Sequence, residues 1–270
     1  MNLLSSINWN SFLIVLGILA VLAIVFTILI LVVSKVCAVY EDPKIAEVSE
    51  NLSGANCGGC GFAGCADFAK ALVEGKTDLS LCSATSKDNK QKIATLLGAE
   101  VKETEPMMAV VKCVGDNSVT EKKFDYIGIN TCSAKNYVQN GDKVCSYSCL
   151  GEGDCELVCA FNAIAKADGV AKVKKENCTA CGMCVKGCPK GIIELIPQRA
   201  NVYVACSSKC KGKDIMSACK VGCIGCGLCA KVCPHGAITM RDNLAIIDYS
   251  KCTGCKTCVS KCPRKIIKEI

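Results

Sequence analysis

Two nested cysteine runs near the C-terminal end carry the most specific chemical pattern in the chain. Both runs have the spacing C-x₂-C-x₂-C-x₃-C-P, the first beginning at Cys223 and the second at Cys252. Thiolates are soft ligands that suit iron–sulfur clusters and zinc. A zinc ribbon needs only C-x₂-C pairs, whereas the third cysteine and the final proline are typical of runs that ligate [4Fe–4S] cubes. The spacing therefore predicts two cubes.

In paired runs of this kind, the fourth thiolate crosses to the neighbouring cube. Crossed ligation assigns one cube to Cys223, Cys226, Cys229 and Cys262 and the other to Cys252, Cys255, Cys258 and Cys233. We therefore expect a bacterial ferredoxin-like arrangement in which each run depends on the other.

The same unit occurs twice more upstream, so four copies form an internal repeat. The first and last cysteines of each copy are ten residues apart, and nineteen residues separate both Cys159 from Cys178 and Cys233 from Cys252. Five residues after each last cysteine stands an isoleucine, namely Ile164, Ile193, Ile238 and Ile267. Residues 109–113 and 201–206 are expected to form matching strands that lead into a cysteine.

The most N-terminal copy departs from the pattern, because Glu152 occupies its second ligand position and Ala160 replaces the proline. We expect Cys145 to supply the missing thiolate, with Cys132 as the alternative. The predicted ligand sets of this pair are then Cys145, Cys149, Cys155 and Cys188 for one cube and Cys178, Cys181, Cys184 and Cys159 for the other.

A different pattern, C-x₂-C-x₄-C-x₁₆-C, precedes the repeats in a glycine-rich loop. Such a loop can wrap a cofactor with backbone amides, and helices are expected over residues 66–74 and 87–97. The predicted ligands of this small module are Cys57, Cys60, Cys65 and Cys82. With the four repeats, five [4Fe–4S] clusters are expected.

Other cysteines flank the first ferredoxin-like pair on both sides and have no place in these five sets. A sixth cluster on Cys113, Cys132, Cys206 and Cys219 is possible by symmetry, but buried thiols or a disulfide explain these four residues more simply. Cys37 is expected to act as a small apolar residue, and Cys210 is assigned no role.

Residues 12–33 contain no charged side chain over 22 positions. As a helix this segment would be about 33 Å long, enough to cross the hydrocarbon core of a bilayer. Trp9 and Tyr40 flank it as interfacial anchors would. A cleaved signal peptide would need a preceding Lys or Arg, a shorter apolar run and a small-residue cleavage site, so we expect a retained single-pass anchor in the cell (inner) membrane. Reduced thiols place the soluble part in the cytoplasm.

The composition fits a metal protein of several small domains. The chain has 270 residues, 26 of them cysteine, 5% aromatic residues and a formal charge of +7. Five oxidised cubes, each of charge about −2, would change that sum to roughly −3. We expect an α+β chain with an anchor (1–36), a 4Fe-4S module (37–100) and tandem bacterial-type two-cluster ferredoxin-like domains (101–205 and 206–270).

The order of these features, with the phrases CLGEGDCELVC (149–159) and CKVGCIGCGLC (219–229), resembles the B subunit of the Rnf complex. The likeness covers nearly the whole chain. It implies an electron-transfer subunit of an ion-translocating ferredoxin:NAD⁺ oxidoreductase, which takes electrons from soluble ferredoxin and passes them to other subunits. It also implies that flavin and NAD sites lie on those subunits, and that the Cys57–Cys82 module faces the membrane-embedded ones.

The residues themselves favour electron transfer. We find no nucleophile or acid–base set, no dinucleotide fingerprint and no P-loop, and no nucleic-acid partner is expected. Lysines surround both pairs and could steer an acidic ferredoxin, although a solvated face is the default interpretation. The alternatives are a polyferredoxin subunit of a hydrogenase or formate-oxidising complex, a membrane-tethered iron–sulfur or zinc sensor, and an extracellular disulfide-rich protein.

Overall fold

The computed structural model describes residues 9–36, 42–100 and 105–270. Tyr40 and Cys37, for which an interfacial and an apolar role were expected, lie outside these ranges. The chain divides into two compact units, residues 1–43 and 44–270. Its mixture of helices and short strands agrees with the predicted α+β class.

The first unit contains one long apolar helix, α1 (Trp9–Val36). Its segment Phe12–Lys35 spans 24 residues with a mean hydropathy of 3.3, and none of it is buried within the protein. Length and composition thus allow α1 to cross a bilayer, as expected.

The second unit begins with a helical module. It comprises α2 (Pro43–Asn51), α3 (Cys65–Val73), the 3₁₀ turn η2 (Leu79–Leu81) and α4 (Lys87–Leu97). Helices α3 and α4 confirm the predictions for this region, while α2 had not been expected. Val48, Phe68 and Ile93 form the centre of its core and are almost completely buried. This core holds the glycine-rich loop between α2 and α3.

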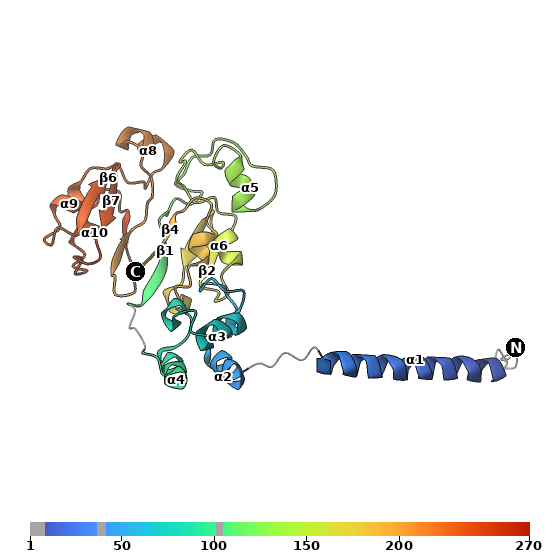
Figure 1. Cartoon of the computed structure of the whole chain (residues 1–270). Coiled ribbons are helices and arrows are strands. Elements are labelled where there is room, and N and C mark those ends of the chain that lie inside the picture. Colours follow the sequence, from blue (N-terminus) through green and yellow to red (C-terminus); the bar gives the residue numbers. More distant parts are fainter. Residues whose placement is uncertain (1–8, 37–41, 101–104) are drawn as a thin grey trace. The chain divides into compact units, whose positions relative to one another are not determined.

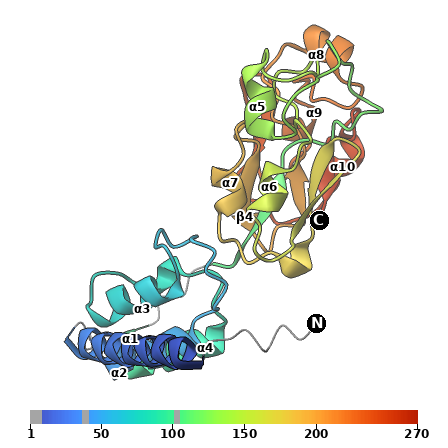
Figure 2. The same cartoon turned by 90° about the vertical axis from the view of Figure 1, so that its right-hand side faces the viewer.

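Four two-stranded antiparallel sheets follow, and they repeat one plan twice (Figures 1 and 2). In the first repeat pair β1 (Met107–Val111) pairs with β4 (Ile193–Pro197), and β2 (Ile164–Ala167) forms a hairpin with β3 (Val170–Val173). In the second repeat pair β5 (Val202–Val204) pairs with β8 (Ile267–Glu269), and β6 (Ile238–Arg241) forms a hairpin with β7 (Leu244–Ile247). Strand β5, which the predicted domain boundary left in the first domain, therefore pairs within the second.

The repeat found in the sequence is a repeat of structure. The isoleucine that follows each run begins a strand, β2, β4, β6 or β8, and is at most 6% exposed. Short helices carry the third cysteine of each run, namely α6 (Asp154–Leu157), α7 (Met183–Lys186), α9 (Leu228–Lys231) and α10 (Thr257–Lys261). The 3₁₀ turn η3 (Lys175–Asn177) precedes the second run. The pattern of cysteine and isoleucine thus marks where each turn ends and each strand starts.

The two pairs differ in the segment between their first strand and their first run. In the second pair this segment carries α8 (Gly212–Ala218), whereas the longer segment of the first pair carries α5 (Cys132–Tyr137). Helices α5 and α8 lie at the same end of the second unit in both views (Figures 1 and 2). The added length in the first pair brings extra side chains to its degenerate run.

Candidate iron–sulfur sites

The structure groups the cysteines into sets of four, which we name by one member. The cavity of the Cys252 set is lined by Cys233, Cys252, Cys255 and Cys258. Cys229 packs in one cluster with Cys223 and Cys262. After burial, the thiols of Cys223, Cys262 and Cys226 raise its pKa, so these three residues complete the Cys223 set. In both sets the last cysteine of one run lies with the first three of the other, which is the arrangement that crossed ligation requires.

The first repeat pair shows the same crossing. Cys159 lines one cavity together with Cys178, Cys181 and Cys184, the Cys178 set. A second cavity is lined by Cys132, Cys149, Cys155 and Cys188, the Cys149 set. Cys132 from α5 therefore takes the position that we had assigned to Cys145.

Cys145 lies instead in a cavity between the two repeat pairs, lined by Cys113, Cys145, Cys206 and Cys219, the Cys113 set. Symmetry allowed a sixth set here, although we had expected buried thiols or a disulfide; the structure brings four thiols together, with Cys145 in place of Cys132. One signal in the sequence could have shown this. Cys145 stands four residues before Cys149, as Cys219 stands four before Cys223, so the two are equivalent residues of the repeat.

Backbone amides converge on the sulfur atoms of these sets. The N–H groups of Ala163 and Ala237 donate to the last cysteine of their runs, Cys159 and Cys233, at 3.3 Å. In the Cys113 set, Cys113 Sγ accepts from the N–H of Cys149 at 3.3 Å, and Cys206 Sγ from that of Cys223 at 3.4 Å. Such donors stabilise thiolates. Four thiols with amide donors around a small cavity fit a [4Fe–4S] cube.

Burial opposes the effect of these amide donors: in the metal-free protein it favours the neutral thiol over the thiolate. It raises the pKa of Cys145, Cys149 and Cys206 to about 11, and that of Cys155 to about 12, where the neighbouring thiols add to it. At neutral pH these thiols are therefore protonated in the metal-free protein. Binding iron must release their protons, which ties ligation to the folded arrangement.

The degenerate run is supported by its own acidic residues. Asp154 accepts hydrogen bonds from the N–H groups of Cys132 and Ser133, at 2.7 and 3.0 Å. Burial by itself would raise the pKa of Asp154, but these bonds hold it below the ordinary value. The hydroxyl of Thr131 caps the same helix by accepting from the N–H of Ala134. The run thereby fixes the helix that delivers the thiol of Cys132.

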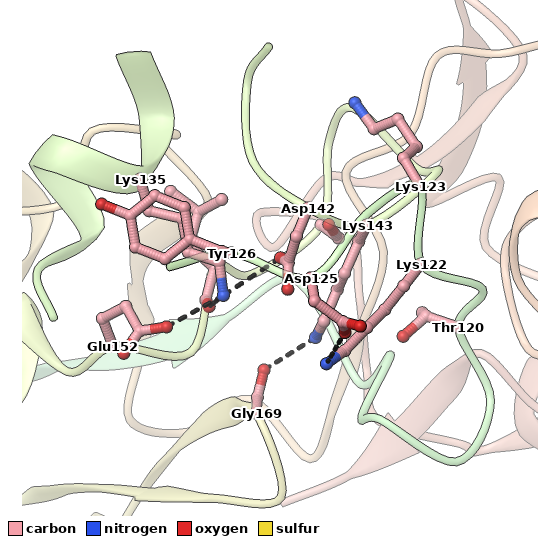
Figure 3. A network of polar contacts seen from close by, with 12 residues as sticks. Thr120, Lys122, Lys123, Asp125, Tyr126, Lys135, Asp142, Lys143, Glu152 and Gly169 are labelled. Atoms are coloured by element: carbon pink, nitrogen blue, oxygen red, sulfur yellow. Dashed lines mark hydrogen bonds and ion pairs between the residues drawn. The ribbon is translucent and has the colours of Figure 1, made fainter. Parts of the chain in front are cut away.

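Glu152, which occupies the second ligand position of the degenerate run, binds Lys135 (Figure 3). Lys135 lies on α5, one helical turn after Cys132. Lys135 Nζ lies 2.9 Å from Glu152 Oε1 and 3.0 Å from Asp142 Oδ1, and the side chain is nearly buried. Burial alone would lower the pKa of Lys135, but the contacts with both carboxylates raise it. Glu152 thus stands at the second cysteine position of the run and forms an ion pair with the helix that carries Cys132.

The module carries the sixth set. Its cavity is lined by Cys57, Cys60, Cys65 and Cys82, the Cys57 set, and by Cys181 of the first repeat pair. The side-chain oxygen of Asn56 accepts from the N–H of Cys65 at 2.8 Å, which orders the loop. The four predicted residues are therefore together.

Neighbouring sets pack against one another in a series. The Cys252 and Cys223 sets share one buried cluster, which contains Cys223, Cys229 and Cys258. A Cβ atom on Gly59 would lie 2.6 Å from Cys181 O, so the module packs directly on the Cys178 set. Cys184 lies in one buried cluster with Cys149 and Cys155, which joins the Cys178 and Cys149 sets. Through the amides of Cys149 and Cys223, the Cys113 set contacts both repeat pairs. Cys210 packs at the edge of the Cys113 set and belongs to none of the six.

These features define a class of protein: a ferredoxin-like iron–sulfur electron carrier with several clusters and an apolar N-terminal helix. Three family models match within the chain. They are a putative Fe-S cluster (residues 52–84), a 4Fe-4S binding domain (171–194) and a 4Fe-4S dicluster domain (222–266).

Three relatives align with nearly the whole length of this chain. The B subunit of the Na⁺-translocating ferredoxin:NAD⁺ oxidoreductase complex of Acetobacterium woodii is 40% identical over 96% of this chain and 78% of its own length. The B subunit of an ion-translocating oxidoreductase complex of Methanosarcina acetivorans is also 40% identical, over 94% and 96%. The B subunit of the proton-translocating ferredoxin:NAD⁺ oxidoreductase complex of Clostridium ljungdahlii is 39% identical, over 97% and 93%.

The chain belongs to the family of B subunits of Rnf-type ion-translocating oxidoreductase complexes. It is an iron–sulfur electron-transfer subunit, as its sequence predicted, and the hydrogenase or formate-oxidising alternative is not favoured. Relatives of nearly equal similarity are named for different coupling ions, Na⁺ and H⁺. Membership of the family therefore does not fix the ion.

The exchange of Cys132 and Cys145 predicts which pairs of substitutions act on one cluster. Cys113→Ser and Cys145→Ser should each remove the iron of one cube. The double variant should lose no more iron than either single variant, because both residues belong to the Cys113 set. Cys132→Ser combined with Cys145→Ser should remove the iron of two cubes. The measurement is iron per protein after anaerobic purification.

Cys210→Ser is the matched control, because Cys210 packs beside the Cys113 set without belonging to it; it should retain all the iron. The assignment is contradicted if the Cys132 and Cys145 substitutions are not additive.

Proposed function

We propose that this chain holds six [4Fe–4S] clusters and relays electrons from reduced ferredoxin to the other subunits of its complex. A bound cube accepts and releases one electron at a time. The observation that supports this proposal most strongly is the series of neighbouring thiol sets, which runs from the Cys252 set through the Cys113 set to the Cys57 set. In this arrangement the Cys113 set joins two ferredoxin-like pairs that would otherwise be separate.

The second repeat pair is the proposed site at which electrons enter the chain from ferredoxin. Cys226 and Cys255 are the two exposed thiols among the described cysteines, and they belong to the last two sets of the series. Exposed lysines lie within or next to the same two runs in the chain, including Lys231, Lys261 and Lys265. A basic surface beside an exposed ligand raises the rate at which an acidic donor such as ferredoxin finds the site.

The Cys57 set is the proposed site from which electrons leave the chain for the partner subunits. It ends the series, and its module is the next folded element after α1 in the chain. Partner subunits in the membrane would receive the electrons there. Helix α1 would then cross the cell (inner) membrane once, with residues 44–270 in the cytoplasm, where thiols remain reduced for ligation.

The proposed entrance predicts a salt-dependent encounter with ferredoxin. Lys261→Glu should lower the second-order rate constant for reduction of this chain by reduced ferredoxin about tenfold at low ionic strength, because attraction to an acidic donor is weakened. The difference should shrink as salt screens the charges. Stopped-flow absorbance measures both.

Lys87→Glu makes the same change in charge on α4, where Lys87 is also exposed, and should leave the rate unchanged. An equal loss in both variants would place the entrance elsewhere.

The proposed exit predicts that Gly59 is needed for transfer and not for ligation. Gly59→Val would force the glycine-rich loop away from Cys181, because even a Cβ atom would lie 2.6 Å from Cys181 O. Iron content should be kept, while electron transfer from the repeat pairs to the Cys57 set should slow. Rapid-freeze EPR after a pulse of reductant measures that step.

Ala63→Val adds bulk to an exposed position of the same loop and serves as the control. Unchanged transfer in the Gly59 variant would show that electrons leave by another set.

A further inference from the structure

Lys143 is a buried ammonium that the relay described above does not yet use. Its side chain is 2% exposed. Nζ donates hydrogen bonds to two backbone carbonyls, Gly115 O at 2.9 Å and Gly169 O at 2.8 Å, the second of which Figure 3 shows. The two carbonyl groups satisfy two of the three N–H donors of the ammonium, but they are neutral and do not balance its charge.

Lys135 in the same segment shows what compensation looks like. It is 6% exposed and lies within 3.0 Å of two carboxylates, Asp142 and Glu152. Within the ranges that the structure describes, no carboxylate lies at ion-pair distance from Lys143 Nζ.

A buried charge without a close partner is costly. Hydrogen bonds with Ser118, and then the charge of Lys143, hold the pKa of Asp116 below its ordinary value, so this carboxylate offsets part of the charge. The neighbouring thiol sets are the candidates for the remainder.

Both carbonyls that bind Lys143 belong to segments that pack against thiol sets. A Cβ atom on Gly115 would lie 3.6 Å from the sulfur atoms of both Cys113 and Cys219, and the N–H of Gly115 donates to Cys113 Sγ at 3.4 Å. On the other side, a Cβ atom on Gly151, within the degenerate run, would lie 2.6 Å from Gly169 O. The ammonium is therefore held between the Cys113 and Cys149 sets.

The two sets meet at Cys113. Its Sγ accepts hydrogen bonds from the N–H of Gly115, whose carbonyl binds Lys143, and from the N–H of Cys149. The charge of Lys143 would therefore attract a bound cube at either set, which carries about −2 when oxidised and about −3 when reduced.

We propose that the buried ammonium of Lys143 sets the reduction potentials of the clusters on the Cys113 and Cys149 sets, making the middle of the relay easier to reduce. This inference rests on the proposed function, because it requires cubes at these two sets. Lys143 acts through its charge and not as a ligand.

The direction follows from the charge change on reduction. One electron arrives from a neighbouring cluster and later leaves to the next, no proton is taken up, and the charge of the cube becomes more negative by one unit. A fixed positive charge favours the reduced state, and it does so more strongly in a buried site than in water. Without Lys143 the affinity of these clusters for the electron should fall.

The test is an EPR redox titration of the full chain, prepared anaerobically, as wild type and as Lys143→Met. We expect an unchanged iron count and a lower potential for one or two clusters, by about tenfold in the equilibrium constant for reduction, which is about 59 mV for one electron. Lys143→Arg keeps the charge and should restore the potentials. Lys213→Met removes an exposed lysine from α8, beside the same cavity, and should shift them less.

The outcomes separate this inference from the proposed function. Wild type without [4Fe–4S] signals would overturn the proposed function itself. Wild type with all its clusters, and Lys143→Met with unshifted potentials, would overturn only the role of Lys143. If Lys143→Met and Lys143→Gln both lose iron while the control keeps it, Lys143 is needed for assembly, and its role in setting potentials is rejected.

Discussion

The whole second unit depends on bringing four thiols from distant parts of the chain to one point. In each ferredoxin-like pair the last cysteine of one run must reach the first three of the other. The strands that hold them are only three to five residues long, too short to form an extensive sheet, and aromatic residues are scarce at 5% of the chain. In the proposed function, ligation would therefore support the fold of the repeat pairs as well as electron transfer.

The Cys113 set extends this constraint from one pair to two. Its thiols come from the segments that follow β1 and β5 and from the residues that precede the two leading runs, so each pair contributes two. The amides of Cys149 and Cys223 donate to it symmetrically. A site built in this way connects the two repeat pairs and lies between their other thiol sets.

The sequence predicts the repeat well because spacing is a local property. Equal offsets between cysteines and isoleucines locate the turns and the strands that follow them, and the crossed sets of the regular runs follow from the spacing. The ligand set expected for the degenerate run differs from the set of thiols that the structure brings together. Cys132 lies in an inserted segment, where distance along the chain says little about distance in space. Its position depends on Asp154 and on the ion pair of Lys135 with Glu152, tertiary contacts that no periodicity reveals.

The central claim is that six sets of four thiolates hold six iron–sulfur cubes. Quantifying iron, acid-labile sulfide and zinc in the anaerobically purified full chain tests it most directly. The account predicts about 24 iron atoms per chain with an equal amount of sulfide and almost no zinc. Zinc without sulfide, or a chain free of iron after preparation without oxygen, would contradict it.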